Sequence, residues 1–284
     1  FNNYFNEIIL NKIENRKNFN FDEKKEIGQG IVFPQDFINK TSNYELNNTY
    51  KVGDGIFALS QKEKEALQLS KEELQLIKPY FKSEQLNRYY GTSKNDYWLI
   101  YTSSKFKNPN EIKPFPNIKK HLDQFQKVIS SDNKPYGLHR TRKESFFKGE
   151  KIIVLRKCAG KPVFTFTDFD AYVSATFYVI KTDRLNQKYL TGLLNSKLIE
   201  FWLKNKGKMQ GNNFQLDKEP LLNIPIFEAS KENQQPIIKL VNKIISLKKA
   251  NLQADTSKLE EEIDELVYQL YKLTPEEIEV VKGL

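Results

Sequence analysis

The 284 residues have a mass of 33.4 kDa and are 39% hydrophobic and 13% aromatic, which is enough apolar material for a packed core and excludes general disorder. The net charge of +9 is uneven, because residues 251–284 hold three Lys and nine acidic residues, which leaves residues 1–250 at +15. A basic body of this kind favours a polyanionic partner, although Lys-rich and Asn-rich sequences can also be basic for compositional reasons. One Cys and two His exclude an internal disulfide and a Cys/His zinc site, and no apolar run approaches the roughly 20 residues that cross a bilayer. We expect a cytoplasmic chain and, since it starts with Phe1 rather than Met, a fragment of a longer protein.

The first half of the chain alternates short helix and strand patterns. Residues 1–20 mix Asn, Lys and Glu with scattered aromatics and predict a connector, after which the pattern becomes globular. The predicted elements are, in order, a turn entering a strand at 29–33, a strand at 56–59 after a Gly-Asp-Gly turn, helices at 61–69 and 71–78, and a strand at 97–101. Pro79 is expected to stop the second helix.

The middle of the chain predicts a helix, three strands and a longer helix. Asn117 is expected to cap a helix with Ile118, Leu122, Phe125 and Ile129 on one face. The predicted strands are 151–156, 162–167 and 171–180, and residues 168–170 predict a hairpin between the last two. Residues 187–205 predict one continuous helix that ends at Gly207.

The last sixty residues change to a purely helical pattern. Apolar residues at helical spacing predict one helix over 237–247 and a second over 259–271, with a capping box formed by Ser257 and Glu260. A short third helix starts at Thr274 with Pro275 in its first position. The two longer helices predict an antiparallel hairpin that needs an apolar partner.

Sites for catalysis are scarce in this sequence. Complete dinucleotide-binding, P-loop and nucleophile-elbow motifs are missing, and Cys158 is interpreted as a core residue. A metal-dependent nuclease would need an acid followed by Glu-x-Lys on a neighbouring strand, and Asp96, Glu111 and Lys113 match that spacing. Because this Glu-x-Lys lies in a proline-rich loop, we predict no catalytic residue and no metal site in the chain.

The basic segment 134–208 contains 16 Lys and Arg and 6 acidic residues, and it is the candidate DNA-binding region. Arg can pair with guanine or phosphate, Asn and Gln with adenine, and Lys with phosphate. The alternative is a pair of solvated surface loops. The predicted DNA-binding residues are Tyr136, His139, Arg140, Arg142, Lys143, Arg156, Lys157, Lys206, Lys208, Gln210, Asn212 and Asn213.

Arg140 and Arg142 are expected to read bases, because alternate residues of an extended segment project the same way. The structural alternative is that one of them pairs with Glu144 or Asp170. Lys206 and Lys208 follow a helix end and are expected to contact phosphates.

An ordered series of short segments resembles a known family. The segments are Gln29-Gly30-Ile31, Ile56–Leu59, Ile77–Phe81 leading to Asn87–Tyr90, Tyr97–Tyr101, Pro116-Asn117-Ile118, Leu138–Arg142, Lys151–Ile153, Leu193–Leu198, Asn223–Ile226 and Leu270–Glu277. Together they resemble the TaqI-like C-terminal specificity domain of type IIG restriction–modification enzymes and N6-adenine DNA methyltransferases. The glycine-rich loop of relatives is reduced here to Gly207 and Gly211, which limits the transfer of base contacts at that loop.

The resemblance implies an α+β (mixed α/β) target-recognition domain over 21–226, with a mixed sheet and flanking helices, and a C-terminal antiparallel helical hairpin over 227–284. It implies double-stranded DNA as the partner and an upstream methyltransferase domain of the same polypeptide. S-adenosylmethionine, and Mg²⁺ where a nuclease is present, would bind in upstream domains and not in this fragment. Half of a type I specificity subunit remains an alternative, and a Mg²⁺-dependent nuclease is a further one.

Overall fold

The buried apolar residues separate into two cores, one on each face of a central sheet. We describe a computed structural model that covers residues 2–283, with side chains from residue 4. Within these residues the strands form sheets of five, four and three strands. Side chains alternate across strand β6 (Lys151–Leu155), so that Ile152 and Val154 belong to one core and Ile153 to the other. The fold is thus mixed α/β, as the sequence predicted.

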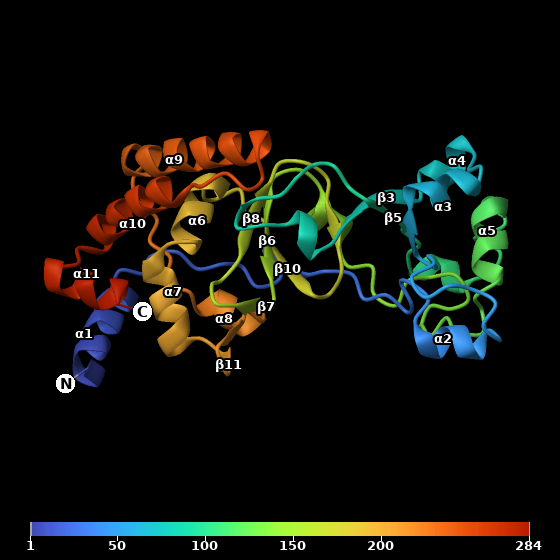
Figure 1. Ribbon diagram of the computed structural model, residues 1–284, viewed down its shortest axis with the longest axis horizontal. Coiled ribbons are helices and arrows are strands. Elements are labelled where there is room, and N and C mark those ends of the chain that lie inside the picture. Colours follow the sequence, from blue (N-terminus) through green and yellow to red (C-terminus); the bar gives the residue numbers. More distant parts are fainter. Residues whose placement is uncertain (1, 284) are drawn as a thin grey trace.

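The five-stranded sheet joins the two ends of the elongated molecule (Figure 1). Its strand order is β1 (Ile27–Gln29), β10 (Phe177–Ile180), β6, β8 (Phe164–Thr167) and β4 (Tyr89–Tyr90). The β4–β8 pair is parallel and the other pairs are antiparallel. Helices cover one face, and the small lobe continues from the other.

The small lobe surrounds the four-stranded sheet, in the order β2 (Ala58–Ser60), β5 (Tyr97–Ile100), β3 (Ile77–Phe81) and β9 (Tyr172–Val173). Its helical elements are α2 (Lys40–Glu45), α3 (Gln61–Ala66), α4 (Lys71–Leu74), η1 (Ser83–Gln85), η2 (Ser104–Lys107), α5 (Pro116–Asp123) and η3 (Glu144–Phe147). The predicted helix 71–78 is wrong in its second half, because Ile77 and Lys78 pair with β5. Pro79 is tolerated in this strand since β9 pairs with it only from Tyr80 onward.

The predicted hairpin at 168–170 is also wrong. Strand β8 pairs with β6, whereas β9 pairs with β3 in the other sheet, so residues 168–170 cross between the two sheets. The fully buried Lys151 fixes this crossover, because its Nζ donates to the carbonyl oxygens of Gly149 (2.8 Å) and Phe169 (2.5 Å). Burial lowers the pKa of this amine to about 7.

The opposite end of the molecule is helical. It contains α1 (Asn2–Asn15), α6 (Gln187–Leu194), α7 (Lys197–Lys206), α8 (Lys218–Asn223), α9 (Lys231–Ala250), α10 (Ser257–Tyr271) and α11 (Pro275–Lys282). The predicted continuous helix 187–205 is interrupted at Asn195-Ser196. There the Ser196 hydroxyl caps α7 and the Asn195 amide donates to the carbonyl of Phe164 (2.8 Å), which ties the break to β8.

Helices α9 and α10 form the predicted antiparallel hairpin, and they pack on the domain through α6. A Cβ on Gly192 of α6 would lie 2.5 Å from Ile237 of α9, so this crossing requires glycine. The cap of α10 is Thr256, which bonds Glu260, rather than the predicted Ser257. The predicted capping box of α11, Thr274 with Glu277, is confirmed.

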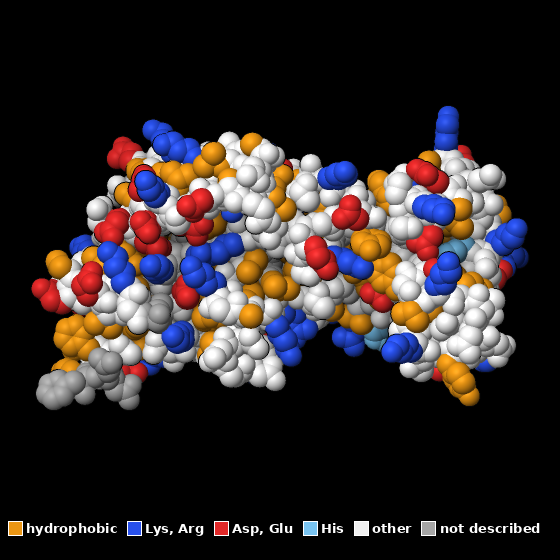
Figure 2. Space-filling view, in the orientation of Figure 1, with side chains coloured by type: hydrophobic (Ala, Val, Ile, Leu, Met, Phe, Trp, Pro, Cys, Tyr) orange, Lys and Arg blue, Asp and Glu red, His pale blue; other side chains and the backbone are white. Residues whose placement is uncertain are grey.

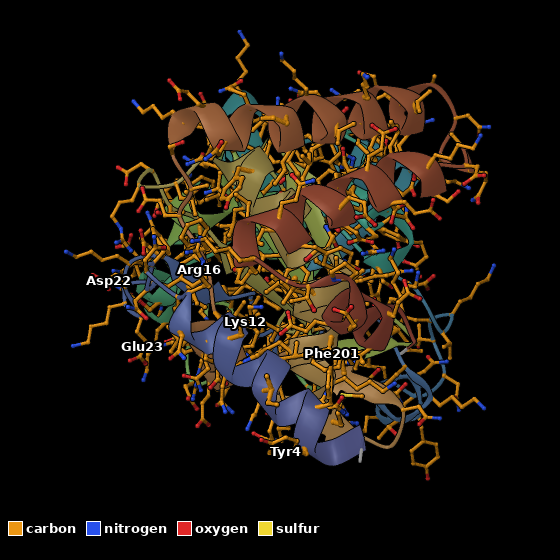
Figure 3. All side chains as sticks on the ribbon, turned by 90° about the vertical axis from the view of Figure 1, so that its left-hand side faces the viewer. Tyr4, Lys12, Arg16, Asp22, Glu23 and Phe201 are labelled. Carbon is orange, nitrogen blue, oxygen red and sulfur yellow. The ribbon has the colours of Figure 1, made fainter. Side chains whose placement is uncertain are left out.

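The segment expected to be a connector (1–20) is helical over Asn2–Asn15, while its first residue lies outside the described part. Ile9 and Ile13 are buried, and Lys12 forms an ion pair with Glu277 of α11 (2.7 Å). Figure 3 views this end of the molecule, with Lys12 labelled on α1. The domain boundaries at 20/21 and 226/227 remain predictions. Across residues 2–283, none of the helices has the length and apolar character of a membrane-spanning segment.

Candidate nucleic-acid interface

Arg156 connects the end of β6 to two other segments, one at residues 175–176 and one at residues 216–217. It follows β6, and its backbone N–H donates to Thr176 (3.1 Å) while its carbonyl accepts from Leu216 (2.7 Å). Its Nε and Nη2 donate to Asp217 (2.9 and 2.6 Å), and its Nη1 donates to the carbonyl of Ala175 (3.1 Å). Because all three nitrogens of its guanidinium donate to protein acceptors, Arg156 holds these segments together.

Asp217 is the carboxylate that accepts from Arg156. Burial acts to raise the pKa of its carboxyl, but the hydrogen bonds and charge of Arg156, together with Gln215, outweigh burial and lower it. Asp217 is therefore ionised at neutral pH. Its other oxygen lies 3.8 Å from Lys208 Nζ, which places a predicted phosphate ligand beside the Arg156 anchor.

A small three-stranded sheet carries most of the predicted polar residues. Its order is β11 (Met209–Gln210), β12 (Asn213–Gln215) and β7 (Lys157–Ala159). Phe214 and Cys158 are buried opposite each other and anchor it to the core. Gln210 pairs with Asn213, so Gly211, in the left-handed region (φ +59°), and Asn212 form a two-residue turn. The carboxamides of Gln210, Asn212 and Asn213 are thereby presented to solvent at the tip of a β-ribbon, next to the exposed Lys157.

The two arginines of the 140–142 segment have different roles. Arg140 exchanges backbone hydrogen bonds with Val32 (3.0 and 3.1 Å), and its side chain is exposed. Arg142 adopts φ +65°, so the segment is not extended and the predicted parallel projection of the two side chains is wrong. Its Nε donates to the carbonyl of Gly30 (3.2 Å) and its Nη2 to Gln29 Oε1 (2.5 Å).

Neither arginine forms the ion pair that the structural alternative expected. Glu144 instead accepts from Tyr172 (2.5 Å) and lies 3.4 Å from Lys78, and Asp170 accepts from the backbone of Gly149. Arg142 is nevertheless held internally, by the Gln29 side-chain amide and the Gly30 carbonyl.

The remaining predicted residues are spread over different environments. Lys143 is exposed beside Arg142. His139 is half-buried and its Nδ1 accepts from the backbone of Asp132 (3.3 Å). Tyr136 is buried, and its hydroxyl donates to Asp123 (2.7 Å), which leaves the ring no surface for a ligand. Lys206 forms an ion pair with Glu7 of α1 (3.1 Å), away from the β11–β12 ribbon.

A series of contacts joins the central residues into one surface. Arg142 bonds Gln29, Gln29 pairs with Tyr178 across the sheet, the Arg156 guanidinium lies 5.6 Å from the Tyr178 ring centroid, and Asp217 bonds Arg156. Figure 2 shows Lys and Arg side chains along the lower edge of the molecule, where its outline is hollowed between the helical end and the small lobe. We call this surface the basic strip and define it as Arg140, Arg142, Lys143, Arg156, Lys157, Lys208, Gln210, Asn212 and Asn213.

Several residues that support the strip were not predicted as site residues from the sequence. Gln29 and Asp217 hold the two anchoring arginines, and the turn of Ser174 and Thr176 contributes a pair of hydroxyls 2.7 Å apart. Each comes from a segment distant in sequence, so only the tertiary structure reveals it. Of the nuclease candidates, Glu111 and Lys113 lie in the turns between η2 and α5, and Asp96 lies in the loop before β5.

A mixed α/β fold with a basic, carboxamide-rich edge is the arrangement expected of a domain that recognises DNA. The chain belongs to the TaqI-like C-terminal specificity domain family, whose sequence profile matches residues 78–226, more than half of the chain.

Individual relatives agree with this family. Over 121 residues the chain is 29% identical to the type II methyltransferase M.HincII of Haemophilus influenzae, a match that covers 38% of this chain and 24% of that protein. The type II methyltransferase M.HindII of Haemophilus influenzae matches equally, with 23% of its length covered. The type IIL restriction–modification enzyme MmeI, solved in complex with DNA, shares the fold with a TM-score of 0.63 at 12% identity, over 95% of this chain and 35% of that one. The chain thus corresponds to about a quarter to a third of these proteins.

Proposed function

We propose that this chain recognises a specific sequence in duplex DNA through the basic strip. The observation that carries the proposal is the gathering of exposed cations and carboxamides on one hollowed edge, above arginines that are bonded internally. Cations without internal partners can displace the counterions of DNA, and carboxamides can discriminate base edges. Membership of the specificity-domain family supports the same function.

The β11–β12 ribbon is the proposed reading element. The major groove of B-DNA admits a two-stranded β-ribbon, and Asn and Gln pair with adenine there. Gln210 and Asn212 lie at the ribbon tip, whereas Lys157 and Lys208 lie beside its base, where phosphates would pass. Arg140 is the proposed contact to guanine or phosphate from the other side of the strip.

Within a longer polypeptide, the domain would position an adenine-N6 methyltransferase, together with any nuclease domain, on the recognised site. The relatives named as type II methyltransferases, most of whose length lies outside the match, support this role. S-adenosylmethionine would then bind to the catalytic domain and not to this chain. In a type I specificity subunit the α9–α10 hairpin would act as a spacer, but its close packing on α6 favours a hairpin that braces its own domain.

Fluorescence anisotropy with duplexes selected from a random pool tests the proposal. We expect binding whose logarithmic affinity falls linearly with the logarithm of salt concentration, by about 0.9 per neutralised phosphate. We also expect no cleavage, no methylation and no heat of S-adenosylmethionine binding in calorimetry. Salt-independent affinity, or failure to enrich any sequence from the pool, would contradict the proposal.

A further inference from the structure

Helix α2 of the small lobe holds an exposed aromatic side chain on a rigid support. A capping box between Asn39 and Ser42 fixes the first turn, with two hydrogen bonds of 2.8 Å. Lys127 Nζ donates to the carbonyl of Glu45 and fixes the last turn (2.5 Å). Between them Tyr44 is 76% exposed. An aromatic ring presented in this way is ready to contact a partner without the loss of loop entropy.

The loop after α2 is ordered in the same way. Asn47 and Asn48 both adopt left-handed conformations (φ 57° and 54°), and Asn43 Oδ1 accepts from the backbone of Tyr50 (3.1 Å). The Tyr50 ring packs against Phe125, with centroids 5.0 Å apart. This anchored loop presents Val52, 59% exposed, next to the tip of the helix.

Exposed lysines lie on α2, on the loop that follows it and on the segment that packs against it. We call this region the α2 edge and define it as Lys40, Tyr44, Lys51, Lys127 and Lys134, of which the last two line a shallow pocket against α2. Within residues 4–283, Lys40 and Lys51 have no ion-pair partner. The chemistry of the α2 edge therefore fits a polyanion that also offers an apolar or ring-shaped contact, as the sugar–phosphate backbone does.

One hydrogen-bonded loop joins the α2 edge to the basic strip. Residues 131–140 include Lys134 of the α2 edge and end at Arg140 of the basic strip. Asn133 Nδ2 braces the loop by donating to the carbonyl of Leu138 (2.9 Å). In Figure 1, α2 and β11 lie along the same edge of the molecule, at opposite ends of the hollow that Figure 2 shows. A duplex held by the strip in this hollow would have the α2 edge at its flank.

We propose that the α2 edge is a second DNA contact, in which Lys40 and Lys51 bind phosphates and the Tyr44 ring packs on the backbone of the duplex. The inference rests on the proposed function and adds to it a second DNA-binding surface, so that the basic strip and the α2 edge act as two jaws on one duplex. The two jaws would differ in kind, since the proposed contacts of the α2 edge, Lys40, Lys51 and Tyr44, are to the DNA backbone and so contribute affinity rather than sequence discrimination.

The first experiment measures the salt dependence of DNA binding for Lys40→Ala/Lys51→Ala. We expect the slope to fall by about 1.8, which is the loss of two phosphate contacts, with an unchanged melting temperature. The matched control is Lys62→Ala/Lys71→Ala, which removes two exposed lysines from α3 and α4 on the opposite edge of the same lobe and should leave the slope unchanged.

The second experiment compares Tyr44→Ala with Tyr44→Phe. We expect Tyr44→Ala to weaken binding roughly fivefold on every duplex and Tyr44→Phe to retain most of the affinity, because the ring makes the contact. If the wild-type chain binds DNA and both α2-edge variants bind equally well, the second jaw is wrong and the α2 edge serves another partner. If the wild-type chain does not bind DNA, the proposed function itself fails.

Discussion

Cations of the helical end and of the basic strip differ in how they are partnered. At the helical end, three cations join separate elements through ion pairs, Lys12–Glu277 (2.7 Å), Arg88–Glu260 (2.8 Å) and Lys282–Glu265 (3.0 Å). On the strip, the side chains of Arg140, Lys143 and Lys157 have no such partner among residues 4–283. A count of charges along the sequence does not separate these cases. Only cations left without internal partners are available to a phosphate backbone, and Arg140, Lys143 and Lys157 bring three of them to the strip.

The same distinction holds within the strip. Arg142 and Arg156 donate to protein acceptors along their forks, whereas Arg140 keeps its side chain in solvent. The anchored arginines cost little entropy on binding and shape the surface, and the free one can meet DNA directly. Variants of the two kinds should therefore affect different measurements.

The largest effect is expected for Gly30→Ala, at the joint that supports the strip. A Cβ on residue 30 would lie 2.0 Å from the carbonyl oxygen of Ser174 and 2.7 Å from that of Val173, and neither backbone can yield easily. We expect a loss of about 3 kcal/mol in the free energy of unfolding, measured by chemical denaturation. Gly283→Ala, whose nearest such contact is 3.4 Å, serves as the control. A Gly30→Ala variant as stable as the wild type would mean that this joint is looser than described.

Arg142→Ala and Arg140→Ala should distinguish an arginine that stabilises the fold from one that contacts DNA. Arg142→Ala leaves Gln29 and the Gly30 carbonyl without a donor, so we expect a loss of about 1–3 kcal/mol of folding stability. Arg140→Ala should melt like the wild type but lose about 1–3 kcal/mol of binding to the selected site and flatten discrimination at one base pair. Thermal melts and binding assays on both variants check this. The reverse assignment would follow if Arg140→Ala were the unstable variant.

Asp264→Asn sharpens the comparison from the helical end. Burial raises the pKa of Asp264 to about 6, against the charges of Arg88 and Lys197, so its ionised form destabilises the folded state. Stability from this group is complete below about pH 3.8 and falls as pH rises to about 6. We expect Asp264→Asn to raise the free energy of unfolding by about 1–2 kcal/mol at pH 8, less than the full pKa shift because the bond from the Lys197 N–H (2.8 Å) becomes weaker.

Denaturation at pH 8 and pH 4 measures this effect, which should vanish at pH 4. DNA binding at pH 8 should not change, because Asp264 lies at the helical end. A gain that is equal at both pH values would show that the carboxylate charge is not its cause.

The sequence predicted elements whose signals are local and missed those decided by distant partners. The predicted helices over 237–247 and 259–271 lie within α9 (Lys231–Ala250) and α10 (Ser257–Tyr271), and the predicted strand 97–101 corresponds to β5 (Tyr97–Ile100). The pairing of β9 with β3 could not be predicted, because the turn at 168–170 is compatible with either sheet. The break between α6 and α7 did leave a trace in the sequence, since Ser196 is a strong capping residue, but the apolar stripe continued across it.

For the site, residue type indicated a candidate region, and the geometry distinguishes the residues within it. Lys157, Lys208 and Gln210 are three of the predicted DNA-binding residues, and they are exposed, so a DNA ligand could reach them. Tyr136 is instead part of the small-lobe core, and Arg142 became an anchor because of one left-handed backbone angle. Neither burial nor that angle can be derived from the spacing of residues along the chain.

The smallest expected effect is that of Lys208→Ala. Lys208 is exposed and lies 3.8 Å from Asp217, whose charge is already compensated by Arg156, so the lysine contributes little to folding. On DNA it should bind one phosphate, and its removal should weaken all duplexes alike and lower the salt slope by about one. Anisotropy on the selected site and on an unrelated duplex measures both. A loss confined to the selected site would instead show that Lys208 contacts a base, so that base contacts would extend to the start of the β11–β12 ribbon.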